Sequence, residues 1–152
     1  MNQIRDNYSK FCEYTTEAQW FLSSCQTIEA GLRGYIIASY DFIRLSLDNK
    51  LPFHLNEQDI KKDSMGTLID KFSKLSNNSD LVSRLRQLVP LRNKCAHHAF
   101  VLKVSSLRSE NSQFESDTIE VKEMFDRSES VYAEVADAYK SVKKLLKAAG
   151  KS

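Results

Sequence analysis

Apolar residues recur at alternating intervals of three and four positions in three parts of the chain. One stripe runs through residues 18–42, a second contains Leu81, Leu85 and Leu88, and a third runs through residues 121–145. This spacing places the apolar side chains on one face of an α-helix. Helices with such faces bury them against one another. The pattern therefore predicts an all-α fold, an antiparallel helical bundle of about five to seven helices.

Local signals set the approximate ends of these helices. Thr16 and Gln19 resemble a capping box, so a new helix is expected to start near residue 17. Gly31 and Gly34 weaken that helix and indicate either close packing against another helix or a break. Whether residues 17–49 form one helix or two therefore stays open. Helices are predicted at residues 2–14, 17–48, 57–62, 64–75, 79–89, 90–102 and 118–149, with Ser79 or Asp80 as the cap of the fifth.

Two segments near the middle of the chain are more ambiguous. Pro90 lacks the N–H that a helix interior needs but fits a first helical turn. We therefore expect one helix to end or kink at Pro90 and the next to carry Arg92 and Asn93 in its first turn, where free N–H groups favour an anion. Residues 103–117 are polar and rich in serine, which predicts a flexible loop, either an ordinary connection or a lid over a bound ligand.

The composition indicates one globular domain, spanning residues 1–152, with enough chain for a buried core. Only four glycines and two prolines are present, which favours helices over a β-sandwich or barrel. No glycine-rich phosphate loop or dinucleotide fingerprint occurs, so no cofactor is predicted. Cys12, Cys25 and Cys95 form no C-x-x-C pair, which fits a reducing cytoplasm. The polar N-terminal segment and the absence of a ~20-residue apolar run predict neither a signal peptide nor a membrane span.

Positive charge is concentrated in one part of the chain. No Asp or Glu lies between Asp80 and Glu110, and this stretch has a formal charge of +6, whereas the whole chain has +2. A local excess of cations suits an anionic partner such as a phosphate backbone, although a solvated basic helix face has the same pattern. The candidate RNA-binding residues in or beside this stretch are Arg84, Arg86, Lys94, Lys103 and Arg108.

The same stretch contains the motif R-N-K-C-A-H-H, residues 92–98. This motif resembles the signature of the HEPN superfamily, which is an Arg, often followed by a polar residue such as Asn, and then a His after four to six intervening residues. The R-N-x-C-A-H-H form is especially similar to abortive-infection proteins of bacteria. The resemblance implies a helical bundle that forms a homodimer, with two Arg/His pairs in a cleft between protomers, and cleavage of RNA without a metal. Arg92 and His97 would then be catalytic, with Asn93 and His98 in supporting roles.

These residue types suit metal-free RNA cleavage. The 2′-OH of RNA is its own nucleophile, and an imidazole with a pKa near 6.5 can transfer a proton at neutral pH. A guanidinium can hold two phosphate oxygens. The resemblance further implies a toxin or phage-defence effector, with a cognate antitoxin or defence protein as a possible partner.

Other interpretations of the motif stay open. Cys95, His97 and His98 are potential metal ligands, but a zinc site usually needs four ligands and the other cysteines are distant in sequence. A nucleophilic Cys95 would need an orienting acid, and none lies nearby in sequence. Finally, Arg92 and His97 could be structural, in a non-catalytic HEPN-like module that binds RNA or a protein partner.

Overall fold

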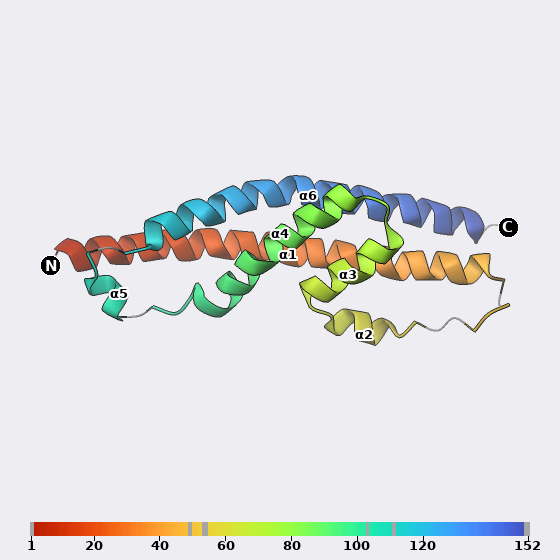
Figure 1. The fold of residues 1–152 in the computed structure, drawn as a ribbon, viewed down its shortest axis with the longest axis horizontal. Coiled ribbons are helices and arrows are strands. Elements are labelled where there is room, and N and C mark those ends of the chain that lie inside the picture. The colour runs from red at the N-terminus through yellow and green to blue at the C-terminus, as the bar shows by residue number, and fades with distance from the viewer. Residues whose placement is uncertain (1, 49, 53–54, 103, 111, 151–152) are drawn as a thin grey trace. The chain divides into compact units, whose positions relative to one another are not determined.

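The computed structural model describes residues 2–48, 50–52, 55–102, 104–110 and 112–150 (Figure 1). About 85% of these residues are helical, in six helices and no strand, which confirms the all-α prediction. None of the helices in these ranges is long and apolar enough to cross a membrane. The helices are α1 (Asn2–Ser46), α2 (Glu57–Lys62), α3 (Met65–Leu75), α4 (Ser79–His98), α5 (Val104–Arg108) and α6 (Phe114–Ala149).

The chain divides into two compact units that share three helices. The first unit comprises residues 1–25 and 88–129, and the second comprises residues 26–87 and 130–152. α1, α4 and α6 each contribute one part to each unit. Each of these three helices runs through both units, so the division does not separate two independent sets of helices. The single domain expected from the composition stays a prediction.

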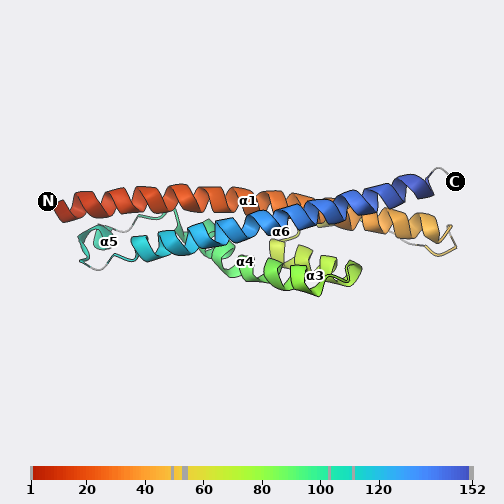
Figure 2. The ribbon, with the colours of Figure 1, turned by 90° about the horizontal axis from the view of Figure 1, so that it is seen from above.

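In the first unit, α6 runs beside α1 in the same direction (Figures 1 and 2). The Ser24 and Ser128 hydroxyls hydrogen bond at 2.6 Å, and Lys122 pairs with Glu13 at 2.9 Å. The antiparallel order that we expected is therefore wrong for this pair of helices. The core of the unit contains Tyr14, Ala18, Phe21 and Cys25 of α1, Leu88, Leu91, Cys95 and Ala99 of the α4 segment, and Val121 of α6.

α1 is one helix of 45 residues, so the predicted break near residue 15 and the predicted capping box are wrong. The Thr15 and Thr16 hydroxyls donate to the Cys12 carbonyl at 3.0 and 2.9 Å. Hydroxyls that bond to a preceding carbonyl in this way allow the helix to continue, whereas a capping hydroxyl would accept from a later N–H.

The glycines of α1 mark close packing in the second unit. A Cβ atom on Gly31 would lie 2.9 Å from Cγ1 of Val135, and one on Gly34 would lie 2.7 Å from Cζ of Tyr139. Of the two alternatives for these glycines, close packing against another helix is thus confirmed and a break is excluded. In this unit too, α6 runs in the direction of α1, because later residues of α1 meet later residues of α6.

α2 and α3 are fixed to α1 in the second unit by polar contacts to backbone carbonyls. Arg33 donates to the carbonyls of Ile60 and Asp63 at 3.4 and 3.2 Å, and its guanidinium also pairs with buried Glu29 at 3.3 Å. The Tyr35 hydroxyl donates to the Leu75 carbonyl at 2.9 Å. α3 buries one apolar face, on which Leu68, Ile69 and Phe72 are fully buried.

α4 begins at Ser79 and continues through Pro90 to His98, which corrects two predictions. Asn78 caps the helix, since its side-chain oxygen accepts from the Leu81 N–H at 3.0 Å. Pro90 is exposed, so water can reach the Arg86 carbonyl that a proline at position 90 leaves without its helical donor. Arg92 consequently lies within a continuous helix and not in its first turn, so the expected anion-binding helix start at Pro90 does not exist.

The predicted loop over residues 103–117 contains regular structure. α5 spans Val104–Arg108, and α6 begins at Phe114, four residues before the expected start. The Asn7 side chain, 1% exposed, donates to the carbonyls of Leu107 and Ser109, both at 3.0 Å. Sequence patterns did not reveal this contact because it joins residues about a hundred positions apart.

Candidate functional site

Arg92, Asn93 and His97 of the motif lie on the outer side of the last two turns of α4. Arg92 is half-buried, Asn93 and His97 are exposed, and Nη1 of Arg92 donates to the Asn93 side-chain oxygen at 3.4 Å. Five positions separate Arg92 and His97, which corresponds to about 7.5 Å along the axis and about 140° around it. The two side chains therefore do not stack on each other, although both reach the surface at one end of α4. The opposite face of this part of α4 consists of Leu88, Leu91, Cys95 and Ala99.

Lys94 ties the motif to α6. Its ammonium lies 3.0 Å from Asp117 and 3.4 Å from Glu120. Burial alone would lower the pKa of Lys94, but the hydrogen bond and charge of Asp117, followed by those of Glu120, outweigh burial and raise the pKa. Lys94 thus stays charged, and its two ion pairs fix the rotation of α4 about its axis so that Arg92 and His97 face outward.

Cys95 anchors the motif from the inner side. Its side chain is fully buried and lies beside the Tyr14 hydroxyl of α1. Burial raises the pKa of Cys95 to about 11 and that of Tyr14 to about 12. A thiol that stays protonated at neutral pH is neither a good nucleophile nor a ready metal ligand. Cys95 therefore has a packing role, which removes the basis for the nucleophilic interpretation.

A metal site at the motif has no support in the described residues. Among them, no group of three or more His, Cys, Asp or Glu side chains is arranged to hold a metal ion. Cys95 faces inward and His97 faces solvent, so these two side chains do not converge. His98 ends α4, but its side chain falls outside the described part of the chain.

Carboxylates from other helices already pair with three of the candidate RNA-binding residues. In the second unit, Arg84 binds Asp80 at 2.9 Å and Glu134 at 2.7 Å, and the Glu134 hydrogen bond is the first cause of the raised pKa of Arg84. Arg86 lies 3.1 Å from Asp70. Together with Lys94, these cations lie in a stretch of sequence that contains no acidic residue. In the fold, acidic side chains from outside that stretch pair with each of them. A phosphate would have to compete with the carboxylates for them.

The other two candidate RNA-binding residues are Arg108 and Lys103. Arg108 is exposed at the end of α5 in the first unit. Lys103 lies outside the described residues. The sequence pattern does not single out the residues that orient the motif, which are Tyr14, Asp117 and Glu120. Asp117 and Glu120 are three residues apart and therefore share one face of α6, which indicates that a cation such as Lys94 can pair with both.

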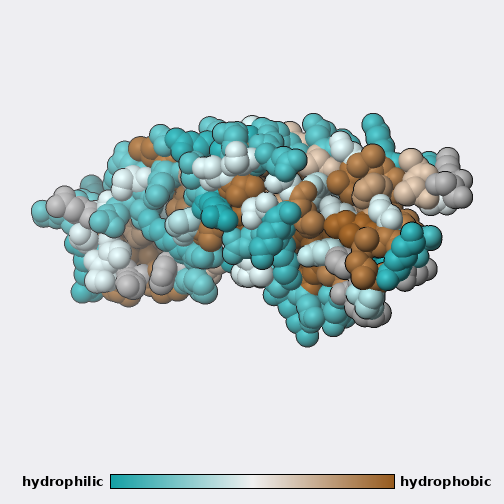
Figure 3. Space-filling model, turned by 45° about the vertical axis from the view of Figure 1, so that its right-hand side comes forward, coloured by the Kyte–Doolittle hydropathy of each residue, from teal (hydrophilic) through white to brown (hydrophobic). Residues whose placement is uncertain are grey.

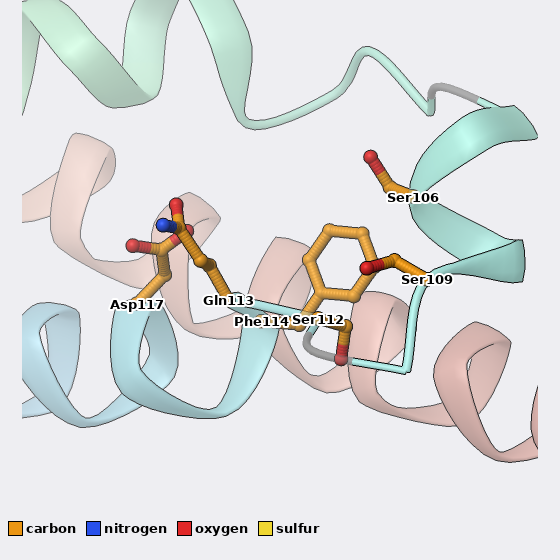
Figure 4. A pocket seen from close by; sticks show the side chains of 6 residues that line it. All are labelled: Ser106, Ser109, Ser112, Gln113, Phe114 and Asp117. Atoms are coloured by element: carbon orange, nitrogen blue, oxygen red, sulfur yellow. The ribbon is translucent and has the colours of Figure 1, made fainter.

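Among the described residues of the first unit, two of the cavities involve residues that follow the motif along the chain. One cavity of about 280 Å³ is lined by Ser106 of α5, by Ser109, Ser112 and Gln113 of the connection that follows, and by Phe114 and Asp117 of α6. The Phe114 ring separates Ser106 and Ser109 from Gln113 and Asp117 (Figure 4). The other, about 300 Å³, is lined by Phe11, Thr15, Thr16 and Gln19 of α1 and by Phe100, which follows α4. Phe100 is 54% exposed, so an apolar ring stands at the surface two residues beyond the motif.

No family model, no curated protein and no solved structure matches this chain.

Proposed function

We propose that this protein is a metal-independent endoribonuclease of the HEPN type that acts as a homodimer, with a toxin or phage-defence role implied by the resemblance. The observation that carries the proposal is the placement of the motif. Arg92, Asn93 and His97 reach the surface at one end of α4, while Lys94 and Cys95 between them are held by other helices. The neighbours of the candidate catalytic residues thus serve to hold the helix in position.

The proposed reaction uses an imidazole as base and another as acid. Neutral His97 accepts the proton of an RNA 2′-OH as its oxygen forms a bond to phosphorus. The bond from phosphorus to the 5′-oxygen breaks, and a protonated His97 of a second copy gives that oxygen a proton. Arg92 holds the non-bridging oxygens and offsets the charge that develops on them. The products are a 2′,3′-cyclic phosphate and a 5′-hydroxyl.

A second copy supplies what one chain lacks in this scheme. One protomer offers a single Arg/His pair, and a two-fold axis doubles it. Apolar side chains beside the motif support such an interface, because Phe100, Val101 and Val104 are 54%, 58% and 64% exposed. Exposed apolar groups next to one another favour contact with a partner surface.

Cleavage of single-stranded RNA in EDTA tests the proposal. The purified protein should produce fragments with 2′,3′-cyclic phosphate ends, which mass spectrometry identifies. The same sequence as DNA, or as RNA with 2′-O-methyl groups, should stay intact because it lacks the attacking hydroxyl. Cleavage of both controls, or activity that needs added Mg²⁺, would contradict the mechanism.

A non-catalytic HEPN-like module is the second candidate, and the ion pairs favour its protein-binding form over its RNA-binding form. Arg84, Arg86 and Lys94 are engaged by carboxylates, which leaves less positive charge for an RNA backbone than the sequence suggests. Such a module would bind RNA or a protein partner without cutting RNA. Binding of unmodified RNA that survives prolonged incubation would favour this candidate over the ribonuclease.

A further inference from the structure

A groove between α1 and α6 in the second unit has a lining unlike that of either cavity in the first unit. Its volume is about 410 Å³, within the ~300–1,000 Å³ of small-ligand sites. Its lining combines small residues with two tyrosines and two lysines, and none of the described lining residues carries a carboxylate. The lining residues are Thr27, Ala30 and Gly31 of α1 and Tyr132, Ala136, Tyr139, Lys140 and Lys143 of α6.

The groove exists because glycine brings the two helices together. Tyr139 packs over Gly34, where a Cβ atom would lie 2.7 Å from the ring, so this tyrosine is fixed against α1. One turn earlier in the two helices, Gly31 lies against Val135, and Ala30 and Ala136 place only methyl groups along the groove, which leaves it open. The Tyr132 ring stands at this opening with 43% of its surface exposed. Apolar and hydrophilic areas adjoin on the molecular surface (Figure 3).

The ammonium groups of the two groove lysines make only weak interactions with other side chains. Lys143 lies 5.3 Å from the centre of the Tyr139 ring, a cation–π distance that places its ammonium beside an aromatic face. Lys140 is 3.8 Å from Asp137, and both side chains are more than 70% exposed, so this ion pair is weak. The other nearby acid of α6, Glu134, is bound to Arg84. An anion can therefore approach Lys140 and Lys143 at little cost.

We propose that this groove binds one nucleotide, with its base against the Tyr132 ring and its phosphate between Lys140 and Lys143. Flat aromatic walls combined with cations are what proteins use for unpaired bases and their phosphates, whatever the base sequence. The nucleotide can be free or part of a single strand, since both offer the same base and phosphate. The inference is independent of the proposed ribonuclease activity, because the groove contains neither Arg92 nor His97.

The test measures binding with two probes that a ribonuclease of the proposed type cannot cut. One is AMP, followed by calorimetry, and the other is a fluorescent 2′-O-methyl RNA hexamer, followed by anisotropy. Binding of AMP alone identifies a free nucleotide as the ligand, and binding of the hexamer identifies a strand. Failure of wild-type protein to bind either probe at millimolar concentration would overturn the inference.

Variants then locate the binding. Lys140→Gln with Lys143→Gln should weaken it about tenfold or more, and Tyr132→Ala should have a similar effect that Tyr132→Phe does not. Ala30→Leu, which fills the groove without changing charge, should also weaken it. The matched control is Lys144→Gln with Lys147→Gln, which removes the same charge from exposed positions of the same helix outside the groove.

The control also decides against the simplest competing explanation. If the Lys144/Lys147 pair weakens binding as much as the Lys140/Lys143 pair, the attraction is general electrostatics of a lysine-rich helix end, and the groove is not a site. The groove contains neither Arg92 nor His97, and calorimetry with AMP measures binding without any cleavage. A ribonuclease that fails to cut and a groove that fails to bind are therefore separate results. Circular dichroism should show that every variant keeps the wild-type helix content.

Discussion

At the scale of single residues, the motif combines outward-facing and inward-facing side chains within seven positions. Lys94 and Cys95 face α6 and α1, and Arg92 and His97 face solvent. Their spacing in sequence was visible, but the direction of each side chain was not. The 3-4 pattern through Leu88, Leu91 and Cys95 does carry that information once the helix is known to continue through Pro90.

Arg92 and His97 should each be essential for RNA cleavage. His97→Ala is expected to lower the rate by roughly 10²–10⁴, the usual contribution of a proton-transfer residue, and added imidazole should restore part of it. Arg92→Lys should lose most activity as well, since an ammonium cannot hold two phosphate oxygens in a fork. Gln87→Ala, at an exposed position of the same helix, is the control. Full activity in both motif variants would show that cleavage occurs elsewhere or by a contaminant.

Tyr14 and Cys95 should make the protein less stable at alkaline pH. Their ordinary pKa values of 10.0 and 9.0 are raised by burial to about 12 and about 11. The folded state therefore holds these protons more tightly than the unfolded state. The resulting stability is complete below about pH 9 and is lost as pH rises through 11 and 12. Urea midpoints from pH 7 to 11 should fall above pH 9, and more gently in Cys95→Ala; equal slopes in the two proteins would contradict this.

At the scale of elements, helix positions followed from sequence far better than helix ends. The positions predicted for α2 and α3 agree with the structure, and the side chains of Asn56 and Ser64 cap these two helices. The continuity of α1 could not be predicted in this way. Thr16 resembles a helix cap in the sequence, but the Thr15 and Thr16 hydroxyls donate to the preceding Cys12 carbonyl. The direction of α6 relative to α1 could not be predicted from the apolar residues of either helix, because an apolar face packs equally well against a parallel or an antiparallel neighbour.

Gly34 and Gly66 should respond in opposite ways to alanine. In a helix, Gly→Ala ordinarily stabilises by about 0.5–1 kcal/mol. Gly66 in α3 has open space around the missing Cβ, so Gly66→Ala should gain about that amount. A Cβ on Gly34 would lie 2.7 Å from the Tyr139 ring, so Gly34→Ala should instead cost about 1–3 kcal/mol. Chemical denaturation measures both.

Shortening the opposing side chain provides the check on this explanation. Tyr139→Ala removes the ring that Gly34→Ala would strike, so the two changes together should cost less than the sum of the single changes. Strict additivity would mean that the glycine acts through backbone freedom and not through close packing.

At the scale of the whole molecule, the proposed site is complete only when two copies meet. Sedimentation velocity should show a dimer at micromolar concentration. Val101→Asp with Val104→Asp should yield monomers, because these exposed apolar side chains flank the end of α4 and carry no charge. Leu51→Asp, at an exposed apolar position of the second unit, should leave the dimer intact. RNA cleavage should be lost together with the dimer; an active monomer would remove the two-copy site.

The shared direction of α1 and α6 has a consequence for how the chain folds. Side chains that meet between them are 104 residues apart in sequence for Ser24 and Ser128, and 109 for Glu13 and Lys122. Helical proteins usually fold within microseconds to milliseconds because most of their contacts are local. Here the main pairing of helices cannot form until a loop of about a hundred residues closes. This protein should therefore refold, in stopped-flow fluorescence of Trp20, with the millisecond-to-second times that are usual for β-sheet proteins.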